Sequence, residues 1–130
     1  MATLTNQKIV TLSDVRDLLD AEVLCGLDLS VRVERVGAAD LMSDVLALST
    51  PGMLLLTGLV SAQVIRTAVV ADLCGVVFVR GKKPAESILS LAQEAKIPVL
   101  RTPLTMFESA GKVYEVLAGN SATGRSVTDS

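Results

Sequence analysis

Short apolar runs alternate along the chain with longer segments in which apolar residues recur at helical spacing. Three such runs follow one another at similar intervals, at residues 53–56, 76–79 and 97–100. The helices that follow them are expected over about residues 62–73, 85–95 and 106–117. Runs that are apolar throughout indicate strands buried on both faces, and therefore parallel pairing with right-handed crossovers. The pattern predicts an α/β fold, a three-layer βα repeat with a mostly parallel sheet flanked by helices.

Two helix starts carry capping residues. Thr11 suits an N-cap, and Asp14 three residues later completes a capping box. This first helix is expected to continue until just before Gly26. Thr105 and Glu108 have the same spacing and predict a second capping box, at the start of the last helix.

The segment between the first helix and the three repeats has two further elements. Residues 30–36 alternate between apolar and charged side chains, which predicts a strand exposed on one face. Residues 39–49 have helical periodicity, and Asp40 is interpreted as the N-cap of that helix. The apolar face of this helix would contain Leu41, Val45 and Leu48.

Length and composition set the domain count and the expected environment. The 130 residues correspond to one domain, expected over residues 1–118, and the polar residues 119–130 are expected to form a disordered tail. Half of the residues are hydrophobic, yet no apolar run approaches the roughly 18 residues that a membrane-spanning helix needs. No signal peptide is recognised at the amino terminus, so a cytoplasmic location is expected. The apolar excess in so small a domain predicts an exposed apolar interface and a homodimer.

Charge and residue types narrow the chemistry. The net charge is −2, which argues against a nucleic-acid partner, and the chain has no histidine, the commonest general base and a frequent metal ligand. Cys25 and Cys74 each precede a glycine at the end of a helix-like segment, and both are interpreted as small buried residues. We therefore expect no catalysis, no metal and no cofactor. A small transferase is the enzymatic alternative, and it would need an activated cysteine.

The loops after the three buried strands are expected to meet at one edge of the sheet. Hydroxyls, cations and helix N-termini would gather there, which is typical of an anion site. The alternative is ordinary loop chemistry, because neither GxGxxG nor GxxxxGK[ST] is present. The candidate anion-binding residues are Thr57, Gly58, Arg80, Gly81, Lys82, Arg101 and Thr102.

Five segments together resemble the DRTGG domain family. They read TLSDVRDLLDAEVLCG at residues 11–26, ADLMSDVLAL at 39–48, TPGMLLLTGL at 50–59, VVFVRGKKP at 76–84 and IPVLRTPLTMFES at 97–109. The resemblance implies a non-catalytic regulatory or dimerisation module. Such modules are found inside bacterial phosphotransacetylases and nucleotide-regulated pyrophosphatases, and also as stand-alone proteins, some of them associated with iron-hydrogenase systems.

The string that names the family, Asp-Arg-Thr-Gly-Gly, is absent. Thr57 and Gly58 remain of it, and Leu59 follows where a second glycine would stand. An apolar residue at this turn favours an interface over a phosphate cradle, so Leu59, Val60 and Arg66 are candidate interface residues. Phe107 and Tyr114 lie seven positions apart on one helical face, which indicates core or interface.

Two functions stay open at this point. The first is a regulatory or protein-interaction module that homodimerises, with a partner enzyme such as a kinase or a hydrogenase system. The alternative is a small-ligand sensor that binds an adenine nucleotide or another phosphorylated metabolite at the carboxyl rim of the sheet.

Overall fold

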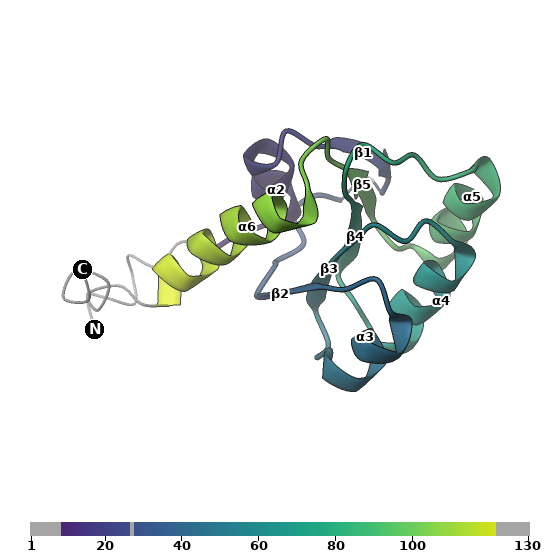
Figure 1. The fold of residues 1–130 in the computed structure, drawn as a ribbon, viewed down its shortest axis with the longest axis horizontal. Coiled ribbons are helices and arrows are strands. Elements are labelled where there is room, and N and C mark those ends of the chain that lie inside the picture. The colour runs from purple at the N-terminus through teal and green to yellow at the C-terminus, as the bar shows by residue number, and fades with distance from the viewer. Residues whose placement is uncertain (1–8, 27, 122–130) are drawn as a thin grey trace.

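A five-stranded sheet forms the centre of the protein, and helices cover both of its faces (Figure 1). The computed structural model describes residues 9–26 and 28–121. In chain order the elements are α2 (Leu12–Leu18), β1 (Glu22–Cys25), β2 (Arg35–Ala38), α3 (Met42–Leu48), β3 (Met53–Thr57), α4 (Ala62–Val70), β4 (Gly75–Phe78), α5 (Glu86–Ala95), β5 (Val99–Arg101) and α6 (Met106–Ser121). The predicted three-layer α/β fold is confirmed.

The strand order decides which loops meet. It is β1-β5-β4-β3-β2, with β2 to β5 parallel and β1 antiparallel to β5. The parallel register pairs Ala38 with Leu56 and Thr57 with Phe78. The carboxyl ends of the four parallel strands therefore lie at the same end of the sheet. The two edge strands are β1 and β2.

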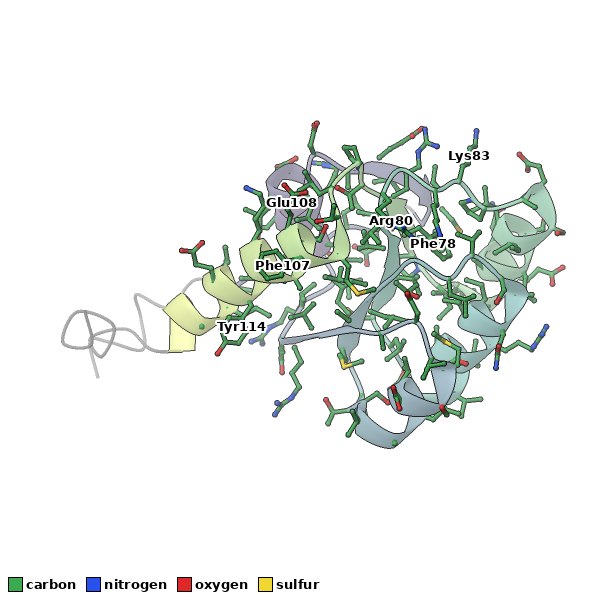
Figure 2. All side chains as sticks on the ribbon, in the orientation of Figure 1. Phe78, Arg80, Lys83, Phe107, Glu108 and Tyr114 are labelled. Atoms are coloured by element: carbon green, nitrogen blue, oxygen red, sulfur yellow. The ribbon has the colours of Figure 1, made fainter. Side chains whose placement is uncertain are left out.

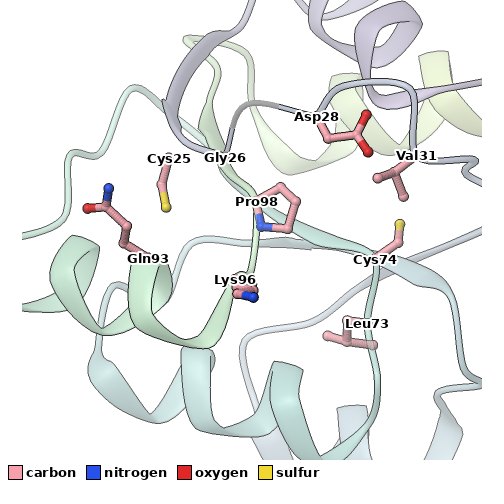
Figure 3. A pocket seen from close by; sticks show the side chains of 9 residues that line it. All are labelled: Cys25, Gly26, Asp28, Val31, Leu73, Cys74, Gln93, Lys96 and Pro98. Carbon is pink, nitrogen blue, oxygen red and sulfur yellow. The ribbon is translucent and has the colours of Figure 1, made fainter.

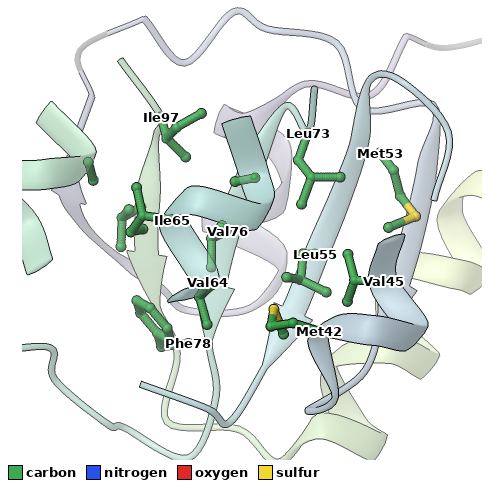
Figure 4. Packing of buried hydrophobic residues seen from close by; sticks show 13 residues of the cluster. Met42, Val45, Met53, Leu55, Val64, Ile65, Leu73, Val76, Phe78 and Ile97 are labelled. Atoms are coloured by element: carbon green, nitrogen blue, oxygen red, sulfur yellow. The ribbon is translucent and has the colours of Figure 1, made fainter. Parts of the chain in front are cut away.

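Two apolar cores explain the continuous apolar strands. On one face, α3, α4 and α5 pack over a cluster that contains Leu55, Val76 and Phe78 (Figure 4). On the other face, α2 and α6 cover a cluster that contains Leu54 and Leu56. Successive strand residues point to opposite faces, so a strand between two helical layers must be apolar at every position.

The first helix is shorter than the sequence pattern predicts. It ends at Leu18, and residues expected to continue it form the antiparallel strand β1. Asp20 adopts a left-handed conformation with φ of 53°, and the N–H of Ala21 donates to the carbonyl of Arg16. This is the hydrogen-bonding pattern of a helix C-cap, with aspartate where glycine is usual. The prediction of one helix up to Gly26 is wrong for that reason.

The next two elements also differ from the prediction. The strand begins at Arg35 instead of residue 30, and α3 has Leu41 at its N-cap position, so Asp40 does not cap it. Met42 and Val45 bring α3 into the core, whereas Leu41 and Leu48 are 63% and 78% exposed.

The other predicted helices agree closely with α4, α5 and α6, and both capping boxes form. Helix α6 continues to Ser121, into the segment expected to be a tail, and residues 122–130 lie outside the described part of the chain.

Candidate functional site

The loops after β2, β3 and β4 bring charged and hydroxyl side chains together at the carboxyl edge of the sheet. We call this set, which comprises Asp40, Thr57, Gly58, Arg80 and Lys82, the rim cluster. Figure 2 labels Arg80 just beyond Phe78, the last residue of β4. Because the three strands are parallel neighbours, residues far apart in the sequence meet here.

Asp40 joins two of these loops. Its Oδ1 atom accepts hydrogen bonds from the backbone N–H of Gly58 at 2.7 Å and from the Thr57 hydroxyl at 3.1 Å. The Thr57 oxygen in turn accepts the N–H of Leu59 at 3.1 Å. A carboxylate with such donors is held more firmly than a neutral acceptor would be. The β2–α3 loop is thereby fixed to the β3–α4 turn.

Two cations lie against the same turn. Lys82 Nζ donates to the carbonyl oxygen of Gly58 at 2.8 Å. A Cβ atom placed on Gly58 would lie 3.2 Å from Arg80 Nη2 and 3.5 Å from Asp40 Oδ1, so both groups approach the glycine closely. The rim cluster therefore surrounds Gly58 with one carboxylate and two positive groups.

The backbone conformation of the β4 loop sets the direction of Arg80. Arg80 and Gly81 are both left-handed, with φ of 61° and 67°. Their N–H groups donate to the carbonyls of Leu104 and Thr102, each at 2.7 Å. These bonds hold a conformation that is unfavourable for arginine, and they attach the β4 loop to the loop after β5.

The remaining predicted anion residues have other partners. Arg101 forms an ion pair with Glu22 at 3.0 Å across the β1–β5 pair. Thr102 is fully buried, donates its hydroxyl to the carbonyl of Leu19 at 2.6 Å and accepts the N–H of Leu104. The structure thus brings Thr57, Gly58, Arg80 and Lys82 together. Gly81 is bonded through its backbone to Thr102, and the side chains of Arg101 and Thr102 bind partners outside the rim cluster.

Comparison with known proteins identifies the family of the chain. The model of the DRTGG domain matches residues 14–116. The chain belongs to the DRTGG domain family. Its fold resembles the crystal structure of the CBS and DRTGG domains of the regulatory region of Clostridium perfringens pyrophosphatase, complexed with the activator diadenosine tetraphosphate. The TM-score is 0.69 at 19% identity, over 83% of this chain and 47% of the other, so the chain spans about half the length of that structure. No curated protein matches the chain.

The predicted interface residues of this DRTGG domain lie on and beside α4. Leu59 and Val60 are half-buried and pack against the apolar cluster beneath α3 and α4. Arg66 is exposed on α4. Leu59 therefore contributes to the core of its own chain as well as to the turn.

Both cysteines of the DRTGG domain border one pocket of about 470 Å³ at the amino edge of the parallel strands (Figure 3). Cys25 ends β1, so the prediction that it ends a helix is wrong, and Cys74 follows α4. Burial raises the pKa of both thiols, that of Cys74 to about 11. Thiols that stay protonated at neutral pH are poor nucleophiles. Among the described residues, no group of three or more acidic, histidine or cysteine side chains is placed to hold a metal ion.

A groove of about 330 Å³ runs between β2 and α6 of the domain. Phe107 and Tyr114 stand on its α6 side and are 88% and 66% exposed (Figure 2). The groove is lined by Val36, Gly37, Ala38, Phe107, Ala110, Gly111 and Tyr114. Their exposure excludes the interpretation that these two aromatic residues belong to the core.

None of the described helices is both long and apolar enough to cross a membrane.

Proposed function

We propose that this DRTGG domain is a non-catalytic regulatory module that forms a homodimer. The observation that carries the proposal is the position of its exposed apolar side chains on both sides of the edge strand β2. Helix α3, which follows β2, and its N-cap residue expose three leucines, and α6, which packs against β2, exposes two aromatic rings. These residues are Leu41, Leu46, Leu48, Phe107 and Tyr114.

An assembly surface accounts for this arrangement better than a free surface does. Large exposed apolar patches on small domains usually mark interaction sites. An edge strand also presents backbone groups that another chain can pair with, and proteins normally protect such edges with charge or proline. Here Arg35 begins β2, and Val36, Gly37 and Ala38 complete it without a charge.

The chemistry of the chain supports a regulatory role without catalysis. The sequence has no histidine, both thiols have raised pKa values, and the Asp40 carboxylate is bonded within the rim cluster. The structural neighbour is the regulatory region of an enzyme. A partner enzyme, such as a kinase or a hydrogenase system, and a cytoplasmic location stay predictions.

Light scattering coupled to size exclusion, over a concentration series, tests the homodimer. The mass is expected to rise from 13.6 kDa towards twice that value as the concentration increases. A mass that stays at 13.6 kDa up to high micromolar concentration would remove the homodimer from the proposal.

A second candidate function is a small-ligand sensor at the rim cluster. Arg80 and Lys82 both lie close to Gly58, and α4 begins four residues later, so positive charge lies near a helix N-terminus. The ligand class is a phosphorylated metabolite, in particular an adenine nucleotide. Because Asp40 already accepts the N–H of Gly58, an incoming phosphate has to displace that carboxylate.

Thermal-shift measurements with adenine nucleotides, diadenosine tetraphosphate and inorganic phosphate test this second function. A ligand present at 100 times its dissociation constant is expected to stabilise the domain by about 2.7 kcal/mol. Unchanged melting with all of these compounds would exclude the rim cluster as their binding site.

A further inference from the structure

The hydrogen bond between Asp40 and Gly58 joins the rim cluster to the segment that leads into α3. Resting on the small-ligand sensor, the second candidate function above, we propose that this bond is an autoinhibitory contact. A phosphorylated ligand at the rim cluster displaces the Asp40 carboxylate, and the displacement loosens α3. Three observations support the proposal: the donor for which Asp40 and a ligand compete, the exposure of Asp40, and the small number of contacts that hold α3.

A ligand phosphate and the Asp40 carboxylate compete for the turn after β3. Gly58 has one backbone N–H donor, and in this structure it bonds to Asp40 Oδ1 at 2.7 Å. A phosphate beside Arg80 and Lys82 also has the same sign of charge as the carboxylate, so the two groups repel each other. A ligand that takes the Gly58 N–H therefore displaces the Asp40 side chain.

The displacement is feasible because Asp40 lies at the surface. The residue is exposed, whereas Gly58 is buried. A carboxylate that moves outwards is hydrated by solvent, and the ligand replaces it as the acceptor of the Gly58 N–H. This buried donor has an acceptor in both states, which keeps the free-energy cost of the exchange low.

Helix α3, which packs beside α4, depends on few contacts for its position (Figure 1). It has seven residues, of which Met42 and Val45 are buried, and its N-cap residue is Leu41, whose side chain has no group that could cap the helix. A helix this short is not stable in water by itself, so α3 relies on its attachment to the rest of the domain. Segments with few buried contacts are also the first to open locally.

Asp40 anchors the beginning of that helix. It lies two residues before Met42, the first residue of α3, and its carboxylate is bonded to the turn after β3. The backbone adds a bond from the N–H of Ala39 to the carbonyl of Leu56 at 3.1 Å. When the carboxylate leaves Gly58, the segment loses a charge-assisted contact, so local opening of α3 should become more frequent.

The effect of the ligand then extends beyond its own site. Helix α3 and its N-cap residue expose Leu41, Leu46 and Leu48 at the surface. A ligand that loosens α3 changes how firmly these side chains are held, which is a regulatory output that requires no catalytic group. By linkage, a contact that holds α3 in place should weaken ligand binding by the same factor.

Hydrogen–deuterium exchange followed by mass spectrometry, with adenosine triphosphate as the probe, tests the loosening of α3. Isothermal titration first establishes binding and the concentration that saturates the domain. A bound ligand stabilises the folded state, so exchange in α5 should slow or stay the same. Exchange over residues 41–48 should instead become about tenfold faster, the order expected for the loss of one charge-assisted hydrogen bond.

Two variants separate the Asp40 contact from other causes of faster exchange. Asp40→Ala removes the carboxylate, so exchange over residues 41–48 should already be fast without the nucleotide, and adenosine triphosphate should not accelerate it further. Asp44→Ala removes another exposed aspartate, in the first turn of α3, and is the matched control. This control should keep the acceleration by the nucleotide.

The outcomes distinguish this proposal from the function on which it rests. Binding of adenosine triphosphate without faster exchange in α3, or with the same acceleration in Asp40→Ala, would overturn the autoinhibitory contact and keep the ligand sensor. Absence of binding in the titration would exclude this nucleotide as a ligand of the domain and overturn both.

Discussion

The carboxylate of Asp40 accepts the buried N–H of Gly58 at 2.7 Å, across 18 positions of the sequence. Gly58 N–H would otherwise lie unbonded at the end of β3, where a polar group without a partner is costly. The same oxygen accepts the Thr57 hydroxyl, so one side chain satisfies two donors of the β3–α4 turn. The contact therefore links the first turn of the α/β repeat to the edge strand β2.

Removing that carboxylate should destabilise the domain. Asp40→Ala leaves the Gly58 N–H and the Thr57 hydroxyl without their acceptor, and we expect a loss of about 2 kcal/mol in the free energy of unfolding. Urea denaturation followed by circular dichroism measures it. Asp44→Ala, at an exposed aspartate in the first turn of α3, is the matched control and should change stability by less than about 0.5 kcal/mol. Equal stability of the two variants would show that the contact contributes little.

Binding of a phosphorylated ligand at the rim cluster should respond in opposite directions to two substitutions. Asp40→Asn removes a negative charge that competes with phosphate for the Gly58 N–H, so affinity should increase. Lys82→Ala removes a cation at 2.8 Å from the Gly58 carbonyl, so affinity should decrease. Isothermal titration with the ligand found by thermal shift measures both, and changes of the same sign would argue against a shared site.

The βα repeat was predictable because its information is local. Uninterrupted apolar runs indicate the three buried strands. Each of the capping boxes at Thr11 and Thr105 involves only four consecutive residues. The end of the first helix was not predictable, because Asp20 takes the left-handed conformation that glycine usually adopts. Val23 and Leu24 continue a helical spacing although they belong to β1.

The candidate site was predictable only in part, because the partners of a side chain depend on which segments the fold brings together. The parallel order of the strands placed Thr57 and Arg80 at one edge, as expected. Arg101 was included for the same reason, yet the antiparallel strand β1 brings Glu22 beside it. Asp40 was interpreted as a helix cap, since its partner Gly58 becomes its neighbour only through the β2–β3 pairing. An acidic residue two positions after a parallel strand is the signal that could have indicated this contact.

The Cys74 thiol should make stability depend on pH in the alkaline range. Its pKa is about 11 in the folded chain, because burial disfavours the thiolate, against 9.0 for an unperturbed thiol. Between these values the unfolded chain loses a proton that the folded chain keeps. The free energy of unfolding should therefore fall as the pH rises from about 9 to about 11.

The contribution of the Cys74 thiol is isolated by a comparison with Cys74→Ala. Urea denaturation measures the free energy of unfolding of both proteins at several pH values across that range. The two proteins differ only in the side chain at position 74, so the difference between their curves is the contribution of that thiol. The decline should be shallower in Cys74→Ala. Parallel curves would mean that the thiol is solvated in the folded chain.

Gly111→Ala should stabilise the domain. Alanine favours the helix interior by about 1 kcal/mol relative to glycine, and among the residues that the structure describes the added methyl group meets nothing within 4 Å. Urea denaturation at low protein concentration should therefore show that the free energy of unfolding rises by about that amount. An unchanged or lower value would show that another group occupies the space beside Gly111.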